Sequence, residues 1–160
     1  FGILLLAGIM LIILGFEGLD SPFVAIVSTA APLALSLGLV WDYLPAWRVA
    51  YLVFVIVGFI AVTITRVARM GRVATITLAV VHGVAGLIIF GLPICLSLTG
   101  ATPAGFILVG IGGALIGVGG LMLSFLKMGK PILSRNAILT VLPGLLFLMT
   151  AAFVAGFTFS

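Results

Sequence analysis

The side chain best suited to chemistry is His82, which is the only histidine and lies near the middle of a long apolar run. A neutral imidazole at bilayer depth can ligate a haem or chlorin, or it can transfer a proton. A haem held by two histidines needs a second histidine, so ligation here requires a methionine or a ligand from another subunit. The alternative is a hydrogen bond to Thr75, Thr77 or a neighbouring carbonyl. We expect this structural role and predict no cofactor, while haem stays open only with an external ligand.

Basic side chains form the second candidate group, because six of the seven flank two short connections between apolar runs. Arg66 and Arg69 stand three residues apart, which places them on one helix face, and Arg72 follows just beyond. Such a group can bind anionic lipid headgroups, or it can serve only to orient the protein in the membrane. The residues predicted to contact anionic lipid are Arg66, Arg69, Arg72, Lys127, Lys130 and Arg135.

Small residues form the third candidate group. Gly113 and Gly117 make a GxxxG pair, a spacing that lets two helix backbones approach closely, within the chain or with a partner subunit. The small residues predicted to pack against other helices are Gly110, Gly113, Ala114 and Gly117 in one apolar run and Ala30, Ala34 and Gly38 in another.

The apolar run that contains His82 is also the most polar one, and it contains a proline. Pro93 removes a backbone donor, so the helix should kink near Ile89, and Ser97 or water can satisfy the freed carbonyl. Broken helices with polar side chains hold the substrate in some transporters. This pattern supports an alternative function, a small transporter or channel for a neutral or lipidic solute.

Residue sets that carry catalysis are missing from the sequence. No charged residue lies in the middle of an apolar run, although ion-coupled pumps and proton channels generally place one there. There is no Cys/His cluster for a metal, no histidine with an acid for nucleophilic catalysis, and no pair of carboxylates for acid–base catalysis. We therefore predict that the protein is not an enzyme and binds no metal.

The elements that must position these residues are membrane-spanning helices. Hydrophobic residues make up 64% of the 160 residues and charged residues 6%, whereas an ordinary soluble domain has about 25% charged residues. A surface so poor in charge must face hydrocarbon. The apolar runs are about twice as long as β-barrel strands and do not alternate, which favours helices. We predict an all-α transmembrane bundle in a single domain over residues 1–160, with about six helices at 1–16, which is cut short, and at 22–40, 49–65, 73–98, 104–126 and 137–159.

The connections between these runs are short, so neighbouring helices should form antiparallel hairpins. Alternate connections carry six of the seven basic residues, and the positive-inside rule then places these loops in the cytoplasm and both chain ends on the outer side. Trp41 and Trp47 with Tyr43 and Tyr51 mark the outer interface. The formal charge of +4 therefore reflects membrane orientation, and we predict no nucleic-acid partner.

Together these patterns favour a structural or accessory subunit of a larger membrane complex, such as a respiratory or electron-transfer complex. Its expected partners are other membrane subunits and bilayer lipids, with anionic headgroups on the cytoplasmic side. The transporter or channel for a neutral or lipidic solute is the alternative.

Overall fold

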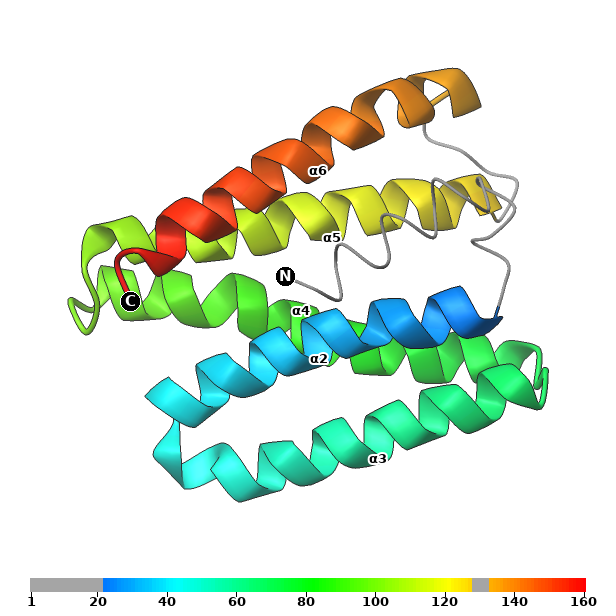
Figure 1. Ribbon diagram of the computed structural model, residues 1–160, viewed down its shortest axis with the longest axis horizontal. Helices are drawn as coiled ribbons and strands as arrows, with labels where there is room; N and C mark the ends of the chain where they lie inside the picture. The colour runs from blue at the N-terminus through cyan, green and yellow to red at the C-terminus, as the bar shows by residue number, and fades with distance from the viewer. Residues whose placement is uncertain (1–21, 128–132) are drawn as a thin grey trace. The chain divides into compact units, whose positions relative to one another are not determined.

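The computed structural model describes residues 22–127 and 133–160 (Figure 1). The long helices in these ranges are α2 (Pro22–Tyr43), α3 (Arg48–Val67), α4 (Arg72–Leu98), α5 (Ile107–Lys127) and α6 (Arg135–Phe157). Two short 3-10 helices, η2 (Pro45–Trp47) and η3 (Ala104–Phe106), precede α3 and α5. The described residues contain no strand, and the predicted all-α bundle is confirmed. The helix predicted at 1–16 lies outside the described residues.

The apolar runs predicted the five helices to within about one turn at each end. The largest difference at a C-terminal end is in α2, which continues through Trp41, Asp42 and Tyr43 beyond the predicted end at residue 40. Hydropathy marks where the chain leaves hydrocarbon, whereas a helix ends where its hydrogen bonds end. Aromatic and polar residues at the interface can therefore continue a spanning helix.

Each of the five helices is long and apolar enough to cross a membrane, and the chain is a multi-pass integral membrane protein. Between 17% and 33% of the residues in each spanning window are buried inside the protein, so most of each helix is left for contact with lipid or with other helices. On α3, exposed branched side chains recur at helical spacing along the whole helix: Val49, Val53, Ile56, Val57, Ile60, Ile64 and Val67.

The chain divides into two compact units, of which the first ends at Ile88 and the second begins at Ile89. The division falls inside α4, four residues before Pro93. Proline has no N–H to donate to the Ile89 carbonyl, and the sequence predicted a kink at this point. The kink itself stays a prediction. Whether both units belong to the single predicted domain stays a prediction.

The first unit contains the antiparallel pair α2 and α3, joined through η2, together with the N-terminal part of α4 (Figure 1). Its apolar core is formed by Leu33, Val62, Val81 and Ala85. A Cβ atom at Gly58 would lie 3.1 Å from Val81 Cγ2, so glycine lets α3 approach α4 closely.

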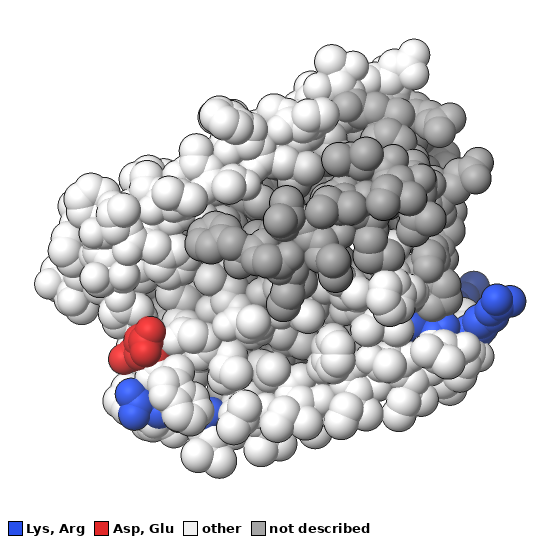
Figure 2. Space-filling model, in the orientation of Figure 1, with Lys and Arg blue, Asp and Glu red and all other residues white. Residues whose placement is uncertain are grey.

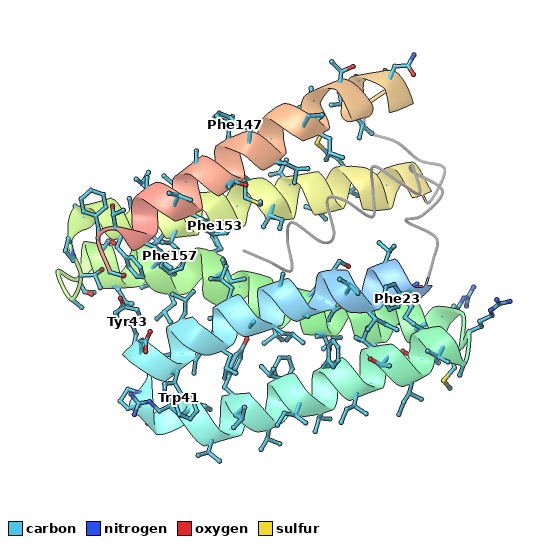
Figure 3. The ribbon with its side chains drawn as sticks, viewed as in Figure 1. Phe23, Trp41, Tyr43, Phe147, Phe153 and Phe157 are labelled. Carbon is cyan, nitrogen blue, oxygen red and sulfur yellow. The ribbon has the colours of Figure 1, made fainter. Side chains whose placement is uncertain are left out.

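The second unit contains the antiparallel pair α5 and α6 with the C-terminal part of α4 (Figure 1). Phe153 and Phe157 extend from α6 near α5, whereas Phe147 points away from the pair (Figure 3) and is 72% exposed. The Phe157 ring centroid lies 6.1 Å from that of the buried Phe106 in an edge-to-face arrangement. Gly156 permits a further close approach, because a Cβ atom there would lie 2.6 Å from the Val109 backbone nitrogen.

Candidate functional site

The turn between α3 and α4 holds three of the predicted lipid-contacting residues, Arg66, Arg69 and Arg72. Basic side chains gather at this end of the first unit, whereas the other end has a carboxylate, drawn in red, beside another basic group (Figure 2). Helix α3 ends in a Schellman motif. The Met70 N–H donates to the Thr65 carbonyl at 3.0 Å, and the Arg69 N–H donates to the Arg66 carbonyl at 3.2 Å. This tight turn brings the three arginines to one end of the α3–α4 hairpin.

Arg69 occupies the position of this motif that usually contains glycine. Its φ angle is +51°, in the left-handed region where a Cβ atom meets the neighbouring carbonyl oxygen. Gly71, two residues later, has a φ angle of +52° and carries no such penalty. The turn therefore retains a strained arginine at a position where glycine would be accommodated better.

Arg66 differs from its two neighbours in burial. Arg69 and Arg72 are exposed, but Arg66 is half-buried and its Nε atom is enclosed without a hydrogen-bond partner. The Nε atom of Arg66 is thus enclosed but finds no acceptor within the described part of the chain.

His82 lies on α4 and is half-buried. Its Nδ1 atom is 3.2 Å from the Leu78 carbonyl oxygen, one turn earlier in the same helix. Because a carbonyl oxygen can only accept, Nδ1 carries the proton in this bond, and the lone pair of Nε2 remains available. The sequence suggested Thr75, Thr77 or a carbonyl as partner; the observed partner is a carbonyl, and the Thr75 hydroxyl donates to the Gly71 carbonyl instead. Ligation of a cofactor by His82 stays a prediction.

The opposite end of the first unit contains aromatic residues and one charged residue of each sign, Asp42 and Arg48. The Arg48 Nε–H donates to the Trp41 carbonyl at 2.5 Å, and the guanidinium carbon lies 5.6 Å from the centre of the Trp41 ring. Trp41, Trp47 and Asp42 are exposed. This arrangement matches side chains at a membrane–water interface, where rings with a polar edge are enriched.

A buried polar group between α2 and α3 was not predicted from the sequence. Thr29 and Ser36 are both fully buried, and the Ser36 hydroxyl donates to the Leu33 carbonyl at 3.1 Å. The Tyr51 hydroxyl is enclosed beside Ser36 but meets no partner in hydrogen-bonding geometry. Thr29 and Ser36 are seven residues apart, a spacing that places two residues on the same face of a helix and that could have identified them.

The glycines of α5 face two different helices. A Cβ atom at Gly110 would lie 2.6 Å from Ile94 Cγ1 and 2.7 Å from the Phe90 carbonyl oxygen on α4. A Cβ atom at Gly112, which was not predicted, would lie 2.8 Å from Phe153 Cδ1 on α6. Glycine is therefore required on both faces of α5, since two helices approach it closely.

The remaining predicted small residues are placed differently. Gly113 approaches α4, with its Cβ position 3.0 Å from the Phe90 backbone nitrogen, and Ala114 is half-buried. Around Gly117 and Gly38, an added Cβ atom would meet no described atom within 4 Å. The other two small residues of α2 are Ala30, which is half-buried, and Ala34, which is exposed. Packing of these open positions against a partner stays a prediction.

The other predicted lipid-contacting residues belong to the connection between α5 and α6. Lys127 is the last residue of α5 and Arg135 is the first of α6, whereas Lys130 lies outside the described residues. Ser97 was one of the polar residues of the proline-containing run that supported the transporter hypothesis. It lies near the end of α4, and its hydroxyl oxygen is 3.4 Å from Thr102 Oγ1. The described residues contain no group of three or more His, Cys, Asp or Glu that could hold a metal ion.

Comparison of the chain with models of protein families, with curated proteins and with solved structures finds no match.

Proposed function

We propose that this protein is a structural, non-catalytic subunit that packs the small-residue face of α2 against a helix of another membrane protein in a larger complex. The observation that carries the proposal is the face formed by Ala30, Ala34 and Gly38, which we call the α2 small face. These residues are four apart, so they share one side of the helix. Ala34 and Gly38 are exposed, and an added Cβ atom at Gly38 would meet no described atom within 4 Å.

The opposite side of α2 supports this interpretation, because it is already occupied. Leu33, Ser36 and Val40 are buried, with at most 2% of each residue exposed. Packing of this side holds α2 in place, so the α2 small face is presented on a fixed helix. Within a bilayer, helices associate mainly through close van der Waals contact, which small residues permit and bulky ones prevent.

The exposed face of α3 provides the contrast. Its branched residues, such as Val53, Val57 and Ile60, are at least 50% exposed and suit contact with mobile acyl chains. The same unit thus presents one bulky face and one small face, and we assign lipid to the first and a protein helix to the second.

Hydroxyl groups in the helices support a role without catalysis. Thr63 donates to the Phe59 carbonyl and Thr150 to the Leu146 carbonyl, both at 2.8 Å and both one turn earlier in the same helix. A hydroxyl satisfied in this way adds little polarity to the helix surface. Such helices contact hydrocarbon and other helices more readily than they line a hydrated path.

We further infer that the α3–α4 turn faces the cytoplasm. It carries Arg66, Arg69 and Arg72, and cytoplasmic loops carry an excess of basic residues. We assign the connection between α5 and α6 to the same side of the membrane, because two predicted crossings, α4 and α5, separate it from the α3–α4 turn in the sequence. Its basic residues agree with this assignment.

The proposal is tested by purifying the tagged protein from native membranes in mild detergent and measuring the co-purifying membrane proteins by quantitative mass spectrometry. We compare Gly38→Leu, which fills the α2 small face, with Val57→Leu, a matched change on the exposed face of α3. The wild type and Val57→Leu should retain the same partner, and Gly38→Leu should lose most of it. A wild-type protein that runs as a monomer without any partner, or equal retention by both variants, contradicts the proposal.

A further inference from the structure

The α3–α4 turn contains a charge arrangement that helix packing does not explain. Arg66 is half-buried and its Nε atom is enclosed without a partner, while Arg69 and Arg72 in the same turn are exposed. A charged group removed from water is costly unless an opposite charge or a hydrogen-bond acceptor compensates it. Asp42, the only carboxylate among the described residues, lies at the far end of the α2–α3 pair (Figure 2).

We propose that Arg66, Arg69 and Arg72 bind the phosphate group of an anionic phospholipid in the adjacent leaflet. The guanidinium group is planar and presents several N–H donors that match phosphate oxygens, and such charge-assisted hydrogen bonds are stronger than neutral ones. The packing around Arg66 Nε restricts the side chain, so less conformational freedom is lost on binding than for a free surface arginine.

The apolar surface beside the arginines points to a lipid and not to free phosphate. Val67 is 66% exposed and Val73 is 49% exposed, and both directly neighbour an arginine in the sequence. Further from the turn, Ile64 and Ile76 are also more than half exposed. A phospholipid held by its phosphate can lay its acyl chains against these side chains, whereas a free anion gains nothing from them.

The strained backbone at Arg69 agrees with a binding role for its side chain. Glycine would remove the left-handed strain, but it would also remove one of the three cations. Unfavourable backbone conformations of this kind persist more often where a side chain is used than where it is not.

The test measures binding of phosphatidylglycerol and of phosphatidylcholine with identical acyl chains to the full chain, by native mass spectrometry from detergent. Wild-type protein should prefer phosphatidylglycerol, and Arg66→Gln should weaken that binding about tenfold. Arg48→Gln removes the same charge at the opposite end of the unit. This variant should change phosphatidylglycerol binding by less than about twofold. A large excess of inorganic phosphate should not displace the lipid, because it lacks acyl chains.

Arg69→Gln combined with Arg72→Gln provides a second variant in case Arg66→Gln does not fold, since both side chains are exposed. It should lose about thirtyfold in phosphatidylglycerol binding, since each of the two basic residues near the surface contributes about 1 kcal/mol. Equal binding of the two lipids, or equal loss in Arg66→Gln and Arg48→Gln, overturns the proposal. Glu17 and Asp20, which lie outside the described residues, are the other two acidic residues of the sequence. If only the double variant Glu17→Gln, Asp20→Asn binds phosphatidylglycerol, the arginines are paired within the chain and the proposal is overturned. Displacement by inorganic phosphate would identify a free-anion site and overturn the lipid assignment.

Discussion

Replacing Gly110 by alanine isolates the energy of the close approach between α4 and α5. The new Cβ atom would lie 2.7 Å from the Phe90 carbonyl oxygen, and a backbone atom cannot move aside as the end of a side chain can. Overpacking of this kind costs about 1–3 kcal/mol. Alanine also favours the helix over glycine by about 1 kcal/mol, which partly offsets that cost. We therefore expect Gly110→Ala to lower the free energy of unfolding by about 0–2 kcal/mol.

Gly117→Ala is the matched control on the same helix. A Cβ atom there would meet no described atom within 4 Å, so only the gain in helix propensity remains, and the free energy of unfolding should rise by about 0.5–1 kcal/mol. The assay is titration of the purified protein with SDS in mixed micelles, followed by far-UV circular dichroism. The free energies of unfolding of the two variants should differ by about 1–3 kcal/mol, with Gly110→Ala the less stable. Equal free energies of unfolding for Gly110→Ala and Gly117→Ala would contradict this prediction, because the contact between Gly110 and Phe90 would then not be tight.

Three further predictions concern single side chains of the first unit. Tyr51→Phe removes an enclosed hydroxyl that has no partner, so in the same SDS titration the protein should be unchanged or more stable by up to about 1 kcal/mol; a loss above that would show that the hydroxyl is bonded. Arg69→Gly relieves a left-handed φ angle and should stabilise the protein by about 1 kcal/mol while weakening phosphatidylglycerol binding, and a loss of stability would contradict the strain argument. The protein purified from native membranes should show no Soret band in its visible spectrum; a band that disappears in His82→Ala would instead establish His82 as a haem ligand.

The sequence predicted the helices well because a spanning helix is specified by a long apolar run, and such a run has few alternative structures. The five described helices follow from this rule. The ends of the helices were less accurate, since Trp41, Asp42 and Tyr43 lie at the interface, where hydropathy no longer distinguishes helix from loop.

The details of helix packing could not be predicted from the sequence. Gly110 and Gly117 look alike in the sequence, yet one lies against the backbone of α4 and the other in open surroundings, because the contact depends on how α5 is rotated. The enclosed Nε of Arg66 could not be predicted either, since a basic residue at the end of an apolar run is usually solvated. The strain at Arg69 depends on the geometry of the turn. A glycine at this position would have predicted a left-handed residue at the end of the helix, whereas an arginine does not.

The most direct test of the central claim, that the α2 small face contacts another membrane protein, is photo-cross-linking in native membranes. After Cys95→Ser, a benzophenone is attached to a cysteine introduced by Gly38→Cys or, as control, by Val57→Cys on the exposed face of α3. Irradiation should give a discrete adduct with one membrane protein from position 38 and only lipid adducts from position 57. Lipid adducts alone from both positions, or cross-links from position 38 only within its own chain, would contradict the claim.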